Sequence, residues 1–197
     1  MRFAIIGGTF NPVHLGHLIC AEQAYLEFNL DKVIFMPAGK PPHKEEDEIN
    51  SPEHRLNMLK LAVDDNNHFE ISDWELKKKG KSYTARTIVH FKEKHQVDKV
   101  NLIIGTDSLS EIFNWYKPEY ILDNSNLIVA KRADYSFTNI MKDQRLRKYE
   151  NNVNILNNSL IEISSTMIRN YVREGKSIKY LTPEEVIKYI KSNNLYK

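Results

Sequence analysis

A glycine-rich stretch joins a short apolar run to an amphipathic segment near the start of the chain. The apolar run, residues 3–6, has the length and composition of a buried strand. Residues 15–28 repeat apolar side chains at helical spacing. Between them, residues 7–17 read Gly-Gly-Thr-Phe-Asn-Pro-Val-His-Leu-Gly-His. This order predicts a strand, a tight loop and a helix whose N-terminus faces the loop.

The loop has the composition of a triphosphate-binding loop. Gly7 and Gly8 carry no Cβ, which lets the backbone adopt positive φ and lets an anion approach its N–H groups closely. The helix start adds unpaired N–H groups and a partial positive charge. Residues 7–17 are therefore predicted to bind phosphates.

His14 and His17 lie three residues apart at the helix start. This spacing lets both imidazoles face a bound phosphate chain. It would also suit a metal, but no third His, Cys or carboxylate stands at ligand spacing, and zinc sites normally need three protein ligands. We expect no metal bound by the protein. The alternative to phosphate binding is a structural role in capping the helix.

A second helix start is predicted at residues 163–169, Ile-Ser-Ser-Thr-Met-Ile-Arg. Ser164, Ser165 and Thr166 are preferred N-cap residues. Arg169 follows on the same helix face, where its guanidinium could grip a β- or γ-phosphate together with the exposed N–H groups. The alternative is an ordinary capped helix with an arginine facing solvent.

Apolar runs and helical segments alternate along the rest of the chain. Strands are predicted at residues 32–36, 69–76 (weakly), 100–104, 127–130 and 159–163. Helix starts are predicted at Ser51, Tyr83 and Thr182, and residues 182–185 have the pattern of a capping box with Thr182 as the cap. Residues 134–158 are polar and predicted to be partly loop. The alternation predicts a Rossmann-like α/β fold: a doubly wound, mainly parallel sheet with helices on both faces and ligands at the carboxyl ends of the strands. We expect one domain, 1–197, with a small helical portion from about residue 164.

Composition excludes several classes of protein. A net charge of +2 is too small for a nucleic-acid-binding face. No apolar run approaches the roughly twenty residues of a membrane span, and the N-terminus lacks a signal-peptide pattern, so we expect a cytoplasmic protein without a membrane partner. Cys20 is the single cysteine and cannot form an internal disulfide. The charged runs 45–48 and 77–81 are interpreted as solvated loops, with weak anion steering as an alternative for the lysines.

The two helix-start motifs together resemble the HxGH nucleotidyltransferases, which adenylylate small phosphate monoesters. Residues 7–17 and 163–169 are similar to the two signatures of this superfamily and stand in the same order. The resemblance implies catalytic roles for His14, His17 and Arg169. It implies ATP contacts from the two motifs and from a strand end, namely Gly7, Gly8, Thr9, Phe10, His14, His17, Gly105, Asp107, Ser164, Ser165, Thr166 and Arg169.

The middle of the chain indicates which substrate accepts the adenylyl group. Residues 41–44 (Pro-Pro-His-Lys), 82–84 (Ser-Tyr-Thr) and 114–116 (Asn-Trp-Tyr) resemble elements of the bacterial nicotinate mononucleotide adenylyltransferases, so that the resemblance spans nearly the whole chain. It implies a mononucleotide site formed by His43, Lys44, Ser82, Tyr83, Thr84, Trp115, Tyr116 and Arg132.

Several of these residues suit their implied roles physically. Asp107 can accept hydrogen bonds from two vicinal ribose hydroxyls, the alternative being a helix N-cap. Trp115 can stack on a pyridine ring, the alternative being plain aromatic packing with Tyr116. Thr84, at a predicted helix start, can hold a carboxylate through hydroxyl, amide and helix dipole. Such charge-assisted bonds should penalise nicotinamide by several kcal/mol, whereas apolar shape alone discriminates by ~1–3 kcal/mol.

The expected reaction transfers the adenylyl group of ATP to nicotinate mononucleotide, giving nicotinate adenine dinucleotide and pyrophosphate. The attacking phosphate is largely ionised at neutral pH and needs no general base, so catalysis should rest on positioning and on charge stabilisation. Mg²⁺ is expected to arrive bound to the ATP phosphates.

The alternatives are a transferase for nicotinamide mononucleotide or phosphopantetheine, and a non-catalytic nucleotide sensor. The oligomeric state stays open, with a homodimer as one option. His54 and Arg55 also match the family pattern, without a physical role beyond helix packing. All of these expectations require the two helix N-termini to converge; Gly8 and Ser165 at opposite ends of the molecule would contradict them.

Overall fold

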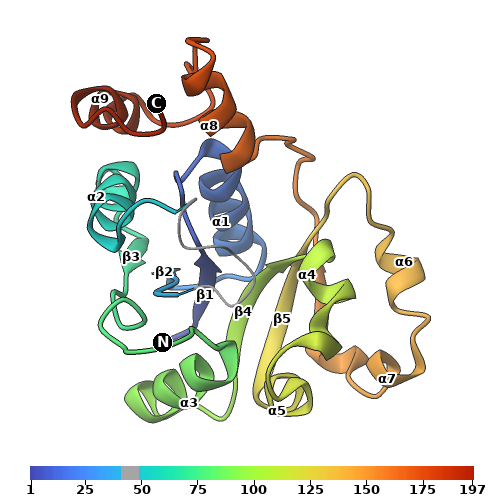
Figure 1. The fold of residues 1–197 in the computed structure, drawn as a ribbon. Coiled ribbons are helices and arrows are strands. Elements are labelled where there is room, and N and C mark those ends of the chain that lie inside the picture. The colour runs from blue at the N-terminus through green and yellow to red at the C-terminus, as the bar shows by residue number, and fades with distance from the viewer. Residues whose placement is uncertain (41–48) are drawn as a thin grey trace.

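The computed structural model describes residues 1–40 and 49–197, so the predictions for His43 and Lys44 and for the charged run 45–48 lie outside the described residues. Within the described residues, one sheet of six strands forms the centre of the molecule (Figure 1). The strands are β1 (Phe3–Gly8), β2 (Lys32–Pro37), β3 (Phe69–Ile71), β4 (Val100–Gly105), β5 (Ser125–Ala130) and β6 (Val153–Leu156).

The sheet is parallel at every strand pair and has the order β3-β2-β1-β4-β5-β6. β1 therefore lies between β2 and β4, where the strand order reverses. In doubly wound sheets the crevice at this reversal, outside the carboxyl ends of the strands, binds ligands. The predicted parallel α/β sheet is confirmed, and its topology places the crevice at Gly8 and Gly105.

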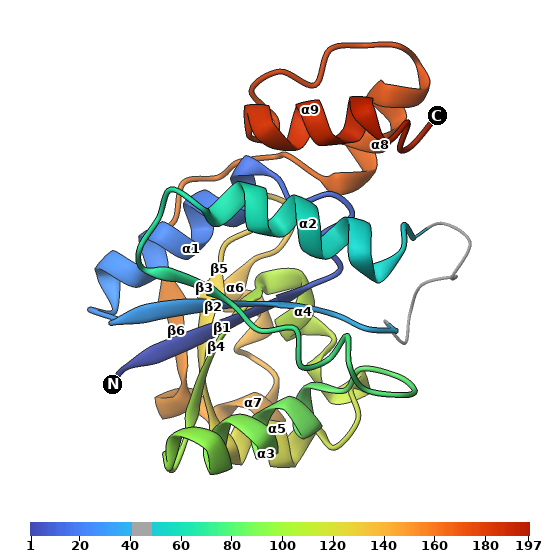
Figure 2. The same ribbon diagram turned by 90° about the vertical axis from the view of Figure 1, so that its left-hand side faces the viewer.

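Helices cover both faces of the sheet (Figure 2). One layer contains α1 (Leu15–Glu27) and α2 (Pro52–Val63), with α8 (Ser165–Arg173) and α9 (Glu184–Ser192) packed beside them. The other contains α3 (Thr84–His95), α4 (Thr106–Ser110), the 3-10 helix η2 (Ile112–Asn114), α5 (Pro118–Asn124), α6 (Phe137–Ile140), α7 (Gln144–Arg147) and the 3-10 helix η3 (Glu150–Asn152). None of the described helices is long and apolar enough to cross a membrane.

Side-chain alternation along the strands builds the two cores. In β1, Ala4 and Ile6 pack into the core under α1 and α2, whereas Phe3 and Ile5 pack into the core above α3 and α5. Successive residues of a strand point to opposite faces, so an uninterrupted apolar run is what a sheet covered on both sides requires. The rigid sheet thus holds its carboxyl ends, and the residues that follow them, in fixed positions.

Two predicted strands differ from the structure. The last strand is Val153–Leu156, inside the segment predicted to be partly loop, and residues 159–163 form no strand. The Ser159 amide donates to the Gln23 side chain and Asn158 donates to the Lys131 carbonyl, so side-chain partners replace a strand ladder there. The weak strand predicted at residues 69–76 ends at Ile71, and a turn follows.

Helix starts follow the predicted capping at two of three points. Ser51 accepts a hydrogen bond from the His54 amide at the start of α2, and Ser164 accepts one from the Met167 amide at the start of α8. The capping role of Thr182 is wrong. α9 begins at Glu184, and the Thr182 hydroxyl instead donates to the Val13 carbonyl at 2.8 Å, which ties the helix entry to the loop after β1.

Candidate active site

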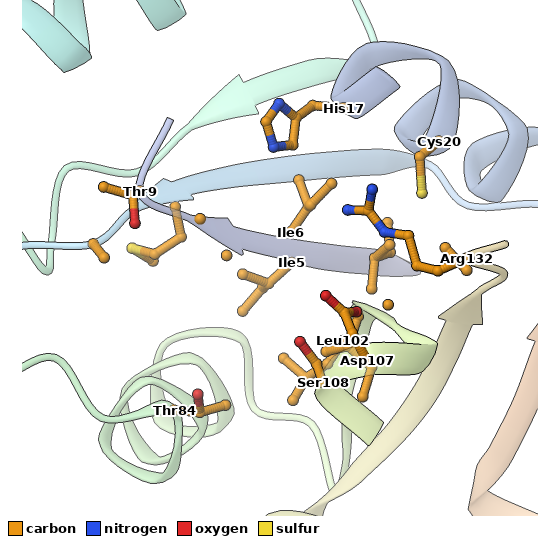
Figure 3. Close-up of a pocket in the computed structure, with 18 of the residues that line it drawn as sticks. Ile5, Ile6, Thr9, His17, Cys20, Thr84, Leu102, Asp107, Ser108 and Arg132 are labelled. Carbon is orange, nitrogen blue, oxygen red and sulfur yellow. The ribbon is translucent and has the colours of Figure 1, made fainter. Parts of the chain in front are cut away.

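A cavity of about 610 Å³ opens at the carboxyl ends of the central strands (Figure 3). Its wall brings together residues that the sequence assigned to two different substrates. From the ATP set it includes Gly7, Gly8, Thr9, His17, Gly105 and Asp107. From the mononucleotide set it includes Ser82, Tyr83, Thr84, Trp115, Tyr116 and Arg132. Phe10, His14, Ser164, Ser165, Thr166 and Arg169 are not part of this wall.

Gly7 and Gly8 lie inside β1, whereas the sequence placed them in the loop that follows the strand. Gly7 and Gly8 are the last residues of the strand, paired with Met36 and Pro37, and neither has a positive φ. The left-handed residue is Phe10, with φ 49°. A Cβ on Gly8 would lie 3.0 Å from the Phe10 ring, whereas one on Gly7 would meet nothing within 4 Å. These glycines therefore leave room for a ring and for a ligand instead of making the turn.

His17 presents its imidazole to the cavity, and His14 lies behind it. The two rings stack with centroids 3.6 Å apart, and His14 is only 4% exposed. The His14 amide donates to Nδ1 of His17 at 3.2 Å, so the helix-capping alternative holds for His17. With Nδ1 as acceptor, neutral His17 carries its proton on Nε2. His17 is thus oriented as a hydrogen-bond donor by the backbone and by His14.

His14 is held neutral by its surroundings. Burial, together with the positive charge of Arg132, lowers the pKa of His14 from 6.5 to about 4. Its Nδ1 is buried and has no hydrogen-bond partner. A Cβ on Gly16 would lie 3.1 Å from this nitrogen, so the glycine of the His-x-Gly-His motif provides the room for the ring.

We predict that His14 makes the folded state sensitive to acid. Since its folded pKa lies below its unfolded value, the unfolded chain binds the extra proton between pH 6.5 and 4, and stability falls as the pH falls through this window. The loss amounts to about 3 kcal/mol at pH 4. Urea unfolding of wild type and His14→Asn, at pH 7 and pH 4, should show the difference in unfolding free energy shift by that amount. Parallel pH profiles would contradict the assignment.

The start of α8 lies directly against the loop after β1, as the two-motif hypothesis requires. Ser165 Oγ donates to the Pro12 carbonyl at 2.8 Å, and Arg169 Nη1 donates to the Asn11 carbonyl at 3.1 Å. Arg169 also contacts Thr166 Oγ1 at 3.3 Å, and its Nε is buried without a partner. The predicted convergence of the two helix N-termini is confirmed. In this structure Arg169 holds the loop from outside the cavity wall.

Asp107 and Arg132 point into the cavity from neighbouring strand ends (Figure 3). Asp107 is in the first turn of α4, whose N-cap is Gly105, so the capping alternative for Asp107 is wrong. Its Oδ1 is buried without a hydrogen-bond partner. The Arg132 amide donates to Thr106 Oγ1 at 3.0 Å, which fixes β5 against the start of α4. With His17, these two side chains form the charged part of the cavity wall.

The opposite side of the cavity is aromatic. Tyr83 and Tyr116 lie with ring centroids 4.7 Å apart, which joins the start of α3 to the segment after η2. Trp115 packs partly into the core beneath and still lines the cavity. Thr84 is the first residue of α3, as predicted, and faces the cavity. Trp115 therefore both packs against the core and lines the cavity.

Two further residues of the site region, Glu75 and Arg55, have roles that the sequence did not reveal, although Arg55 matches the family pattern. Glu75 lines the cavity, and burial raises the pKa of its carboxyl although Thr87 and Ser82 donate hydrogen bonds to it. Arg55 is fully buried beside Thr9. A lone glutamate in a charged run and an arginine inside a helix carry no local signal, since their burial depends on distant segments.

In residues 1–40 and 49–197, no three His, Cys, Asp or Glu side chains are grouped so that they could hold a metal ion. Cys20, which lines the cavity, has its pKa raised to about 11 by burial and is a poor ligand in the thiol form.

Known proteins share both the sequence and the fold. The cytidylyltransferase-like family model matches residues 5–171. A "Probable nicotinate-nucleotide adenylyltransferase" of Clostridium botulinum (strain Eklund 17B / Type B) is 42% identical over 100% of this chain and 98% of its own length. A relative of the same name from Desulfitobacterium hafniense (strain Y51) is also 42% identical, over 100% of this chain and 96% of its own.

A solved structure agrees at the level of fold. Plasmodium falciparum nicotinic acid mononucleotide adenylyltransferase complexed with NaAD superimposes with a TM-score of 0.82, covering 98% of this chain and 96% of that one at 19% sequence identity. Full-length identity near 40% with the bacterial relatives goes further than the fold. The chain therefore belongs to the cytidylyltransferase-like family and, within it, to the nicotinate-nucleotide adenylyltransferases.

Proposed function

We propose that the chain transfers the adenylyl group of ATP to nicotinate mononucleotide, giving nicotinate adenine dinucleotide and pyrophosphate, a step of NAD biosynthesis. The observation that carries this proposal is the composition of the cavity at the strand ends. His17, Arg132 and Asp107 stand on one side and Tyr83 and Trp115 on the other, so that a charged half and an aromatic half share one space. A nucleotide triphosphate and a pyridine mononucleotide match these two halves.

In the proposed reaction, a phosphate oxygen of nicotinate mononucleotide attacks the α-phosphorus of ATP. The new O–P bond forms as the bond from the α-phosphorus to the bridging oxygen breaks, and pyrophosphate leaves with that electron pair. His17 donates through Nε2 to a phosphate oxygen of ATP at the α- or β-position, and Arg132 supplies positive charge to the phosphate of nicotinate mononucleotide. The triphosphate continues toward the start of α8, where Thr166 and Arg169 contact its far end.

Different side chains hold the two substrates. Asp107, with its unpaired buried oxygen, accepts hydrogen bonds from the ATP ribose. Trp115 stacks on the pyridine ring, and the Thr84 hydroxyl and amide hold the carboxylate at the start of α3. Both reactants are anionic and the protein adds no covalent step, so catalysis rests on alignment and on charge stabilisation.

Mg²⁺ enters this proposal as part of the substrate MgATP. It commonly keeps water molecules and phosphate oxygens as ligands, which agrees with the assignment of no protein ligand to it. We further propose a cytoplasmic location, which the single cysteine of the sequence supports, and binding of no nucleic acid. The Plasmodium falciparum enzyme of the same fold is complexed with NaAD, which supports binding of a dinucleotide product by this chain.

The decisive test offers purified protein and MgATP three acceptors separately: nicotinate mononucleotide, nicotinamide mononucleotide and phosphopantetheine. Pyrophosphate release and adenylylated product are measured for each. We expect the highest kcat/KM with nicotinate mononucleotide, because the amide loses charge-assisted bonds and phosphopantetheine has no ring to stack on Trp115. A higher kcat/KM with another acceptor would contradict the proposed substrate. ATP binding without pyrophosphate release from any acceptor would favour a nucleotide sensor.

A further inference from the structure

Arg55 of α2 has a buried guanidinium that donates hydrogen bonds to three backbone carbonyls. The side chain is 1% exposed. Nη1 donates to the Thr9 carbonyl at 2.8 Å, Nη2 to the Gly39 carbonyl at 3.3 Å and Nε to the Asn50 carbonyl at 3.2 Å. The three acceptors belong to three segments: the loop after β1, the residues after β2 and the entry to α2. One side chain therefore joins the loop at Thr9 to two segments that lie 30 and 41 residues further along the sequence.

Two of these acceptors lead to opposite halves of the cavity. Thr9 lines the cavity beside Gly8, in the half assigned to ATP. Gly39 donates its amide to Ser82 Oγ at 2.9 Å, and Ser82 lines the half assigned to the mononucleotide. The path Thr9, Arg55, Gly39, Ser82 thus connects the two halves by three consecutive hydrogen bonds. We call this path the Arg55 link.

The Arg55 link is held tightly at its mononucleotide end. A Cβ on Gly39 would lie 2.5 Å from the Glu75 carbonyl oxygen, so backbone packs directly on backbone at this point. The Ser82 amide donates to the Lys40 carbonyl at 3.0 Å. A shift of Gly39 would therefore be passed on to Ser82, and from there to the start of α3.

Stability alone does not favour an arginine at this place. Burial lowers the pKa of Arg55, which shows that the charge loses solvation in the fold. Among the described residues no carboxylate forms a salt bridge with it. Without such a partner, only the hydrogen bonds to the three carbonyls offset the lost solvation. What the guanidinium adds is geometry, since its planar fork directs several N–H groups at fixed angles, which a lysine ammonium does not.

We propose that Arg55 is a positioning residue that sets the distance between the ATP half and the mononucleotide half of the cavity. This inference rests on the proposed function. A reaction between two bound substrates depends steeply on their alignment, and a misplacement of 1 Å can cost about 10²-fold in rate. Loss of Arg55 should therefore lower turnover while each substrate still binds to its own half.

The test compares Arg55→Met with wild type at a temperature where both are folded. Arg55→Met keeps an extended side chain and removes the donors. We expect kcat to fall by about ten- to a hundredfold, whereas calorimetric Kd values for ATP and for nicotinate mononucleotide, each measured alone, stay within about threefold of wild type. Arg55→Lys, which keeps the charge and one donor nitrogen, should recover part of kcat.

Leu59→Ala is the matched control for a purely structural effect. Leu59 is fully buried on the same helix, and its apolar side chain cannot donate a hydrogen bond to the loops. We expect this variant to lower the melting temperature while kcat stays within about twofold of wild type. A kcat of Arg55→Met within twofold of wild type, or a kcat loss equal to that of Leu59→Ala at equal loss of stability, would overturn the inference.

Hydrogen exchange provides a readout independent of turnover. Arg55→Met and Arg55→Lys should speed amide exchange at Gly39 and Ser82, and Leu59→Ala should not. Unchanged exchange at these amides in both Arg55 variants would overturn the inference even if turnover fell. A wild-type chain that releases no pyrophosphate with any acceptor would contradict the proposed function, whereas wild-type turnover combined with an unaffected Arg55→Met variant would contradict only the Arg55 link.

Discussion

Replacing His17 by alanine is expected to lower kcat by about 10²- to 10³-fold, the size of effect seen when one oriented donor to a developing charge is removed. The structure supports a large effect because the His17 ring faces the cavity and is held from two sides. The His14 amide donates to its Nδ1, and the His14 ring stacks on it at 3.6 Å. The measurement is steady-state pyrophosphate release at saturating MgATP and nicotinate mononucleotide.

His68→Ala is a suitable control for His17→Ala, because His68 is exposed and stacks on Tyr25, and it does not line the cavity. Its kcat should equal that of wild type. Circular dichroism and a melting curve verify that His17→Ala remains folded, since the lost contact at the start of α1 costs only about 1 kcal/mol. A kcat of His17→Ala within threefold of wild type would remove His17 from the mechanism.

Replacing Trp115 by alanine is expected to raise KM for nicotinate mononucleotide by about 10- to 100-fold, because stacking of a base on an aromatic side chain contributes ~1–3 kcal/mol. Trp115 lines the aromatic half of the cavity with Tyr83 and Tyr116, opposite the charged half. KM for ATP should change by less than threefold. The measurement is initial rates over a series of mononucleotide concentrations at saturating MgATP, then the reverse.

The second tryptophan of the chain offers a matched control for Trp115→Ala. Trp74 stacks on His90 with centroids 4.4 Å apart and is absent from the cavity wall. Trp74→Ala should leave KM for the mononucleotide within about twofold of wild type. A raised KM for ATP with an unchanged KM for the mononucleotide in Trp115→Ala would show that the indole serves the other substrate.

Local sequence patterns predicted most of the regular elements. Apolar runs of strand length identify the four central strands β1, β2, β4 and β5, because a strand covered on both faces is mostly apolar. The caps at Ser51 and Ser164 were also predictable, since a hydroxyl needs only the amide three residues ahead.

The sequence-based predictions fail where contacts with distant segments determine the local structure. The strand predicted at residues 159–163 was wrong because the sheet edge is occupied by Val153–Leu156, while Gln23 satisfies the Ser159 amide. Thr182 was assigned to a cap, but its hydroxyl reaches Val13, 169 residues away. The positive φ that Gly7 and Gly8 would permit occurs at Phe10 instead, because the glycines extend β1 beside Pro37 and the turn comes later.

The α/β alternation, the two helix starts that approach the loop after β1, and the family were all predictable from the residues alone. These follow from residues that act over a few positions: apolar periodicity, capping hydroxyls and glycines without a Cβ. Only the tertiary structure decided that His17 faces the cavity while His14 lies neutral behind it, that Arg169 holds the loop from outside, and that Arg55 joins Thr9 to Gly39. Burial and contact between remote segments set these roles, and both exist only after the chain has folded.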